Sequence, residues 1–391
     1  MLTRRLLAAG FALGAALFQG GSLTAARAAT PGVFTDRIVL GQSAKLSGTS
    51  GTELGKQYRD GLLLAFEAAN RSGGVFGRKL QLISLDDGNN PEAGRANTRK
   101  LIDSGVFALV GYTFSGPVRA ALPLARESDI PFIGPYAAMP ELYDNPVPNV
   151  FMFRAGSGDE LAAIVRHIDT VGYQGVAMVH YPNALGEELR KEVNSRLQAT
   201  GRQLVATATM QINSADSNKA AATAVAALAA PSCPTVLVLG VSGRDAAAVV
   251  RGLREKQCGS VRYFARHLVD IPMLVRELGP SARGVMVTQL VPNPHRGAHP
   301  LVMDYRNQLA RRSPAAKPDF TEFEGFIVGR FVVQALQQSG ADLDKPRFMR
   351  AMESATLDGP GGYRVHFGSR QRVGSRYTNF VMISDSGRIT D

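Results

Sequence analysis

The sequence predicts an α/β protein of two lobes, each built around a doubly wound parallel sheet. Short apolar stretches alternate with amphipathic segments of about 10 to 15 residues, which is the pattern of strands joined by covering helices. The alternation occurs in two successive series, over residues 38–134 and 159–288. A chain of 391 residues also exceeds what one hydrophobic core usually organises, which favours two domains.

The first series begins with a strand at 38–45, followed by a glycine-rich loop at 47–51. The next helix, 53–70, carries apolar residues at helical spacing from Leu54 to Phe66. The remaining elements of this series are strands at 80–85, 107–111 and 131–134 and helices at 91–103 and 115–128.

The second series continues the alternation, and the C-terminal third is less regular. Its elements are helices at 159–171, 184–200, 218–229, 244–255 and 271–278 and strands at 175–180, 204–210, 235–239, 261–265 and 284–288. After a proline- and histidine-bearing loop, the last part has helices at 301–312, 321–339 and 345–355 and strands at 363–367 and 379–383.

Residues 1–28 have the composition of an export signal. Arg4 and Arg5 precede an apolar stretch at 6–18 that is too short to span a bilayer, and Ala26-Arg27-Ala28 is a small-x-small cleavage pattern. The alternative is an uncleaved membrane anchor. The paired arginines leave open whether export uses the general or the twin-arginine route. We expect a protein that is exported from a bacterial cytoplasm.

The charge is basic but dispersed. The formal net charge is +11, of which Arg4, Arg5 and Arg27 contribute three. The other basic residues are interspersed with carboxylates, without a run of five or more like charges. This distribution does not indicate a nucleic-acid partner, and it is compatible with attraction of anionic solutes.

Cys233 and Cys258 are the only cysteines. Each precedes a predicted strand, so consecutive parallel strands would bring both to one edge of a sheet. In an oxidising compartment we expect a disulfide between them, the alternative being two unreactive thiols. No metal is expected, since a second CxxC or a paired histidine motif is missing.

Catalytic and phosphate-binding motifs are absent from the sequence. There is no GxSxG, HExxH or GxGxxG. The segment 51–56 has three residues between its glycines instead of four, and Gln57 follows its lysine where a phosphate loop needs Ser or Thr. Asp86 and Asp87 are adjacent strand residues that point to opposite faces, which favours a structural role. We therefore expect neither an enzyme nor a cofactor.

Ser115 is the strongest candidate for a binding residue. It follows a buried strand and precedes Gly116-Pro117, which is typical of a helix N-cap. The amides and dipole at such a terminus attract a carboxylate, and ligands of open α/β sheets bind beyond the carboxyl ends of the strands. The alternative is a cap that serves only its own helix.

At several places the chain resembles the periplasmic leucine/isoleucine/valine-binding proteins, the solute receptors of ABC importers. The matching residues are Ile38-Val39-Leu40-Gly41, Leu46-Ser47-Gly48, Gly55, Gly61, Ala65, Asn70-Arg71-Ser72-Gly73-Gly74-Val75-Phe76-Gly77-Arg78-Lys79-Leu80, Asp86-Asp87, Pro91, Val110-Gly111, Ser115, Ile130-Pro131, Pro135, Ala137-Ala138 and Pro140-Glu141-Leu142. The resemblance covers nearly the whole chain after the signal.

The resemblance implies a type I periplasmic-binding-protein fold, in which two lobes are joined by a three-strand hinge. The crossings are expected at 154–157, 288–291 and 359–362. Lobe 1 would comprise 30–155 plus 290–358, and lobe 2 would comprise 156–289 plus 362–391. Such a protein is a periplasmic monomer that closes on its solute by hinge motion and docks on a membrane permease.

The resemblance also implies a site, and here the match departs from the family pattern. The family's serine matches Ser115, its threonine falls at Ala138, its acidic residue falls near Arg266-His267 and its cleft tyrosine near Ser242. A basic pair would repel an ammonium group. Further expected site residues are Ser47, Leu54, Thr113, Phe114, Tyr136, Ala137, Tyr181 and Arg244.

Two alternatives stay open within this site. Arg244 and Arg266 either hold a second anionic group or are solvated surface residues. Tyr136, Phe114 and Tyr181 either stack on an aromatic ligand or pack the lobe surface.

The sequence thus predicts a solute-binding protein of a branched-chain amino-acid-type ABC importer. Its ligand would be an amino acid or a related small carboxylate. The altered residues fit an aromatic or dicarboxylic acid better than an aliphatic amino acid. The alternative function is a sensory receptor module for such a carboxylate, because fold alone does not set function.

Overall fold

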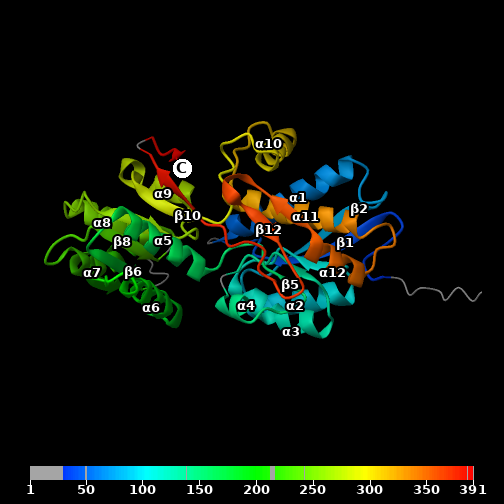
Figure 1. Cartoon of the computed structure of the whole chain (residues 1–391), viewed down its shortest axis with the longest axis horizontal. Coiled ribbons are helices and arrows are strands. Elements are labelled where there is room, and N and C mark those ends of the chain that lie inside the picture. Colours follow the sequence, from blue (N-terminus) through cyan, green and yellow to red (C-terminus); the bar gives the residue numbers. More distant parts are fainter. Residues whose placement is uncertain are drawn as a thin grey trace, which may run out of the picture.

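The computed structural model describes residues 30–48, 51–137, 139–211, 216–241, 243–384 and 386–390. They form two lobes that lie side by side along the long axis of the molecule, each with its own sheet (Figure 1). The predicted export signal and two predicted site residues, Ala138 and Ser242, lie outside the described residues.

The first sheet has five strands in the order β2-β1-β3-β4-β5, and every neighbouring pair is parallel. Its strands are β1 (Arg37–Ala44), β2 (Lys79–Asp86), β3 (Ala108–Val110), β4 (Phe132–Ile133) and β5 (Val150–Phe151). The helices of this lobe that precede β5 are α1 (Thr52–Arg71), α2 (Pro91–Asp103), α3 (Ser115–Glu127) and α4 (Pro140–Asp144).

Three helices from late in the chain complete the first lobe (Figure 1). They are α10 (Pro300–Arg312), α11 (Phe320–Gln338) and α12 (Lys345–Ser354). Glycines let α11 approach α1 closely. A Cβ atom on Gly61 would lie 1.9 Å from the carbonyl oxygen of Glu322, and one on Gly325 would lie 2.2 Å from that of Tyr58. The first core therefore joins residues that are more than 250 positions apart in the sequence.

The second sheet has seven strands in the order β14-β13-β10-β9-β8-β6-β7. They are β6 (Val176–His180), β7 (Ala206–Thr209), β8 (Val236–Gly240), β9 (Arg262–Ala265), β10 (Val285–Gln289), β13 (Asn379–Ile383) and β14 (Ile389–Thr390). The accompanying helices are α5 (Ser157–Val171), α6 (Ala184–Gln198), α7 (Ser217–Ala229), α8 (Gly243–Glu255), α9 (Ile271–Leu278) and the short 3₁₀ turn η1 (Gly279–Ala282). Strand β13 pairs in antiparallel fashion with both β10 and β14. The second sheet therefore has an antiparallel edge, whereas the sequence predicted parallel pairing.

The last crossing between the lobes differs from the sequence-based boundary at 359–362. That glycine-rich segment turns a hairpin between β11 (Thr356–Asp358) and β12 (Arg364–His366), and it contains the 3₁₀ turn η2 (Pro360–Gly362). Beyond the hairpin, Tyr363, Val365 and Phe367 are buried in the first-lobe core. The chain joins the second sheet only at β13, because these apolar side chains keep it on the first lobe.

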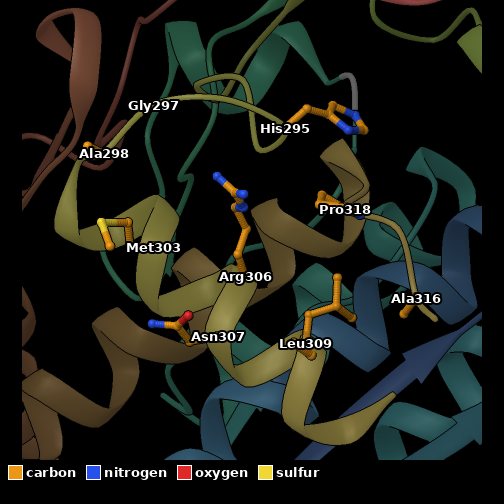
Figure 2. Close-up of a pocket in the computed structure, with 10 residues that line it drawn as sticks. His295, Gly297, Ala298, Met303, Arg306, Asn307, Leu309, Ala316 and Pro318 are labelled. Atoms are coloured by element: carbon orange, nitrogen blue, oxygen red, sulfur yellow. The ribbon is translucent and has the colours of Figure 1, made fainter. Parts of the chain in front are cut away.

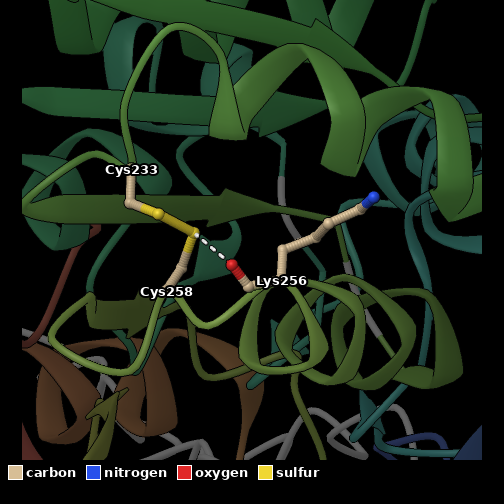
Figure 3. Close-up of a disulfide and its surroundings, with 3 residues drawn as sticks. All are labelled: Cys233, Lys256 and Cys258. Atoms are coloured by element: carbon tan, nitrogen blue, oxygen red, sulfur yellow. Dashed lines mark hydrogen bonds between the residues drawn. A yellow bond between two sulfur atoms is a disulfide. The ribbon is translucent and has the colours of Figure 1, made fainter.

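Cys233 and Cys258 form a disulfide in the second lobe (Figure 3). Cys233 precedes β8 and Cys258 precedes β9, and these two strands are parallel neighbours. Their Cα atoms are 5.6 Å apart, within the usual range for the bond. In the described part of the chain, no helix combines the length and apolar character that a bilayer crossing requires.

Candidate functional site

The loops that follow β1, β3 and β4 are tied together at the carboxyl ends of these strands. The Tyr136 amide donates to the Tyr112 carbonyl at 2.7 Å, and the Phe114 amide donates to the Tyr136 carbonyl at 2.9 Å. The amide of Lys45 donates to the Thr113 hydroxyl at 3.1 Å. These bonds fix the strand ends at which an open α/β sheet binds its ligands.

Helix α3 begins at Ser115, and Phe114 occupies the N-cap position predicted for the serine. Phe114 has φ = 66°, a left-handed conformation that is unusual for an aromatic residue and occurs where the surrounding structure enforces it. Its ring covers Gly51, where a Cβ atom would lie 2.8 Å from the Phe114 Cζ atom. Ser115 is partly exposed at the first turn of the helix.

Tyr136 lies where the two lobes meet. Its ring centroid is 5.2 Å from that of Tyr58 and 3.7 Å from the guanidinium carbon of Arg154. The ring of His267, which follows β9 in the second lobe, approaches Tyr136 edge-on at 6.2 Å. Tyr136 is 7% exposed, so this contact between the lobes is largely closed to solvent.

A buried carboxylate, Glu160 on α5, holds the second-lobe side of this contact. Its oxygens accept from Arg266 Nη2 at 3.2 Å, the Thr288 hydroxyl at 2.5 Å and the His267 amide at 3.0 Å. His267 Nδ1 lies 2.8 Å from Glu160 Oε2. The expectation that Arg266 and His267 present a basic pair to the ligand is wrong, because Arg266 is itself buried and its charge is neutralised by Glu160.

The same network sets the protonation of both groups. Burial alone would raise the pKa of Glu160, but His267, Arg266 and Thr288 together hold that pKa well below its usual range. Burial lowers the pKa of His267 to about 4, and the charges of Arg154 and Arg266 act in the same direction while Glu160 opposes them. At neutral pH the site therefore presents a neutral imidazole beside an ionised, fully bonded carboxylate.

Arg154 and Glu324 form a second buried pair behind Tyr136. Arg154 follows β5 at the first crossing between the lobes, and Glu324 lies on α11. The Nε and Oε1 atoms are 3.4 Å apart, and the side chains are 4% and 6% exposed. Burial raises the pKa of Glu324, although Arg154 opposes this shift. The sequence analysis did not identify either side chain as a site residue. The one available signal was that Glu324 is a charged residue within the apolar stretch of α11.

The remaining predicted residues fall into three groups. Tyr181 donates to Asp245 Oδ2 at 2.9 Å, which places it in a polar cluster on the second lobe. Leu54 and Ala137 pack against first-lobe cores. Ser47 is exposed, and the Arg244 side chain is 76% exposed with its Nε 3.4 Å from Glu277 Oε1.

A cavity of about 540 Å³ lies on the first lobe between α10 and the loops at 295–298 and 316–318. Figure 2 shows His295, Met303, Arg306 and Pro318 around this cavity. None of the predicted site residues lines it. Among the described residues, no group of three or more His, Cys, Asp or Glu side chains is arranged to hold a metal ion.

The sequence matches known solute receptors. The family profile described as "Periplasmic binding protein" matches residues 37–388. The "Amino acid binding protein" of Pseudomonas aeruginosa is 26% identical over 275 residues, which cover 68% of this chain and 70% of that one. The Leu/Ile/Val-binding protein of Escherichia coli K12 is 26% identical over 154 residues, 39% of this chain and 42% of that one. The chain thus spans less than half of the latter relative.

Solved structures match over almost the whole chain. A possible leucine/isoleucine/valine-binding protein from Rhodopirellula baltica SH 1 aligns with a TM-score of 0.79 and 24% identity, covering 93% of this chain and 98% of that one. A solute-binding protein from R. palustris in complex with benzoate aligns with a TM-score of 0.75 and 19% identity, covering 90% and 95%. At these identities the likeness establishes the two-lobed fold.

Proposed function

Because the chain belongs to the periplasmic binding protein family, we propose that it captures a small carboxylate-bearing solute between its lobes and delivers it to the permease of an ABC importer. The relatives that it matches are solute-binding proteins, not enzymes. The observation that carries the proposal is the meeting of Tyr136 and His267, from the strand ends of opposite lobes, beside the first turn of α3.

The carboxylate is bound at the start of α3. Ser115 lies at the first turn of α3, and the positive end of the helix dipole favours an anion there. Tyr136 and Phe114 supply aromatic surface beside this anchor. The hydrogen bonds between the loops after β3 and β4 hold the anchor rigid before the solute arrives.

The ligand is a carboxylate without a strong requirement for an ammonium group. An ammonium needs a free carboxylate in the second-lobe wall, and Glu160 already accepts from three partners. Non-amino acids therefore belong in the test beside amino acids. The similar proteins include Leu/Ile/Val-binding proteins and a solute-binding protein in complex with benzoate.

Capture and release require hinge motion between the two lobes. The solute would enter an open form, and closure would bring His267 against Tyr136, as in the present structure. The protein would act in the periplasm after removal of the export signal, as a monomer. The same capture step would serve a sensory receptor. Uptake of radiolabelled solute by cells with and without the gene separates the two roles.

The experiment is a thermal-shift screen of the purified protein against amino acids, aromatic acids and dicarboxylates, followed by calorimetry. A ligand that binds only the native state raises the melting temperature. We expect Ser115→Ala to weaken binding of the solute by about 1–3 kcal/mol, the value of a hydrogen bond to a charged group. Ser104→Ala, whose hydroxyl bonds the Leu101 carbonyl away from the cleft, is the matched control. Equal affinity of both variants would contradict the carboxylate anchor.

A further inference from the structure

Two atoms of the Arg154–Glu324 pair lack hydrogen-bond partners. In the described part of the chain, Arg154 Nη2 and Glu324 Oε1 are among the few buried side-chain polar atoms without one. One is an unused donor and the other an unused acceptor, and both belong to groups whose burial is costly. Buried polar groups in native proteins are almost always satisfied, so this pair calls for a partner that is missing from the protein itself.

The pair's own contact does not fill this need. Arg154 Nε and Glu324 Oε1 are 3.4 Å apart and do not form a hydrogen bond. A charged pair in a low-dielectric interior is favourable only when additional hydrogen bonds satisfy both groups. As an internal ion pair the arrangement is incomplete.

The position of the pair is next to the contact between the lobes. The Arg154 guanidinium lies against the Tyr136 ring, which also contacts His267 of the second lobe. The Arg154 charge also contributes to the lowered pKa of His267, and Glu160 to the raised pKa of Glu324. The unpaired atoms therefore lie beside Tyr136, close to the contact between the lobes.

We propose that Arg154 and Glu324 form a neutral donor–acceptor subsite that binds a hydroxyl group of the solute, at the opposite end from its carboxylate. This rests on the proposed function, because it specifies a second recognition point in the same cleft. A hydroxyl oxygen accepts from Arg154 Nη2 while its proton is donated to Glu324 Oε1. One atom thereby satisfies both groups.

Charged groups fit this subsite less well. A second carboxylate would meet the Glu324 carboxylate, and an ammonium would meet the Arg154 guanidinium, because the two groups are only 3.4 Å apart. The class of solute that follows is a hydroxy monocarboxylate, such as a hydroxylated aromatic acid lying beside Tyr136. An ordered water molecule in place of the hydroxyl is the competing occupant.

The test is calorimetry of the wild-type protein with matched acids that differ only in one hydroxyl. Suitable pairs are benzoate with 4-hydroxybenzoate, phenylacetate with 4-hydroxyphenylacetate, and pentanoate with 5-hydroxypentanoate. A site built to bond a hydroxyl strongly rejects the analogue that lacks it, because its own buried groups are then left unpaired. We expect the hydroxy acid to bind at least tenfold more tightly in one of the pairs.

Glu324→Gln tests the residues directly. It keeps the shape of the side chain but removes the charge, so the preference for the hydroxy acid should fall at least fivefold while dicarboxylates gain affinity. Glu353→Gln is the matched control, because Glu353 pairs with the buried Arg372 at 2.7 Å elsewhere on the first lobe. If Glu324→Gln does not fold, the calorimetry of the wild-type protein with the matched acids alone tests the subsite.

The outcomes separate this inference from the proposed function. If the two acids of every matched pair that binds have affinities within twofold of each other, the subsite is overturned, and a water molecule occupies the place between Arg154 and Glu324. The proposed function as a carboxylate receptor is not affected by that result. An unchanged hydroxyl preference in Glu324→Gln would also overturn it. Failure of every carboxylate to bind the wild-type protein would remove both the proposed function and the subsite.

Discussion

Replacing Glu160 by glutamine should destabilise the protein by about 3–5 kcal/mol, the cost of removing one partner from a buried ion pair. Glu160 is fully buried and the Arg266 side chain is 7% exposed, so solvent cannot compensate the remaining charge. Glutamine retains one oxygen, which can still accept from the Thr288 hydroxyl and the His267 amide. Its amide nitrogen would then face Arg266, where two hydrogen bonds from Nε and Nη2 now end.

Guanidinium-induced unfolding of the wild-type protein, Glu160→Gln, Arg266→Gln and the double variant measures this effect. The double variant removes both charges, so its loss should be clearly smaller than the sum of the two single losses. A loss below about 1 kcal/mol in Glu160→Gln, or strictly additive losses in the double variant, would refute the reasoning that burial makes this pair interdependent.

Two further predictions concern stability. The unfolded chain protonates His267 near its ordinary pKa of 6.5 and the folded protein only near 4, so the unfolded state binds more protons in this interval and stability should fall as the pH drops from 6.5 to 4. The slope approaches about 1.4 kcal/mol per pH unit, and an unaltered slope in urea titrations of His267→Gln would contradict this assignment. The double variant Cys233→Ser/Cys258→Ser should lose about 3.5 kcal/mol, because the disulfide closes a loop with a sequence separation of 25. Equal melting temperatures of this variant and the wild-type protein would count against it.

Sequence periodicity predicts most of the fold because most elements are long enough to show a period. Helix 53–70 and strand 38–45 are found at Thr52–Arg71 and Arg37–Ala44. Helix α4 and strand β5 were missed, since five and two residues carry no measurable periodicity. Strand β14, with two residues, was missed for the same reason.

The site was predictable only where the signal was local. The start of α3 was found from Ser115 and Pro117, although Phe114 proved to be the capping residue. The role of Arg266 was misjudged because its partner, Glu160, lies more than 100 positions earlier. Arg154 and Glu324 are 170 positions apart, and no pattern in a single sequence joins them.

The glycine contact between α1 and α11 has a consequence for how the chain folds during synthesis. Helix α1 leaves the ribosome early, but the surface that covers Gly61 is supplied by residues 320–338. Strands β6 to β10 of the second lobe are complete by residue 289, before that surface exists. The parallel part of the second sheet can thus form first, while the face of α1 stays exposed and prone to incorrect association. A fragment that ends after β5 should therefore not fold on its own, because the first lobe depends on a later part of the chain.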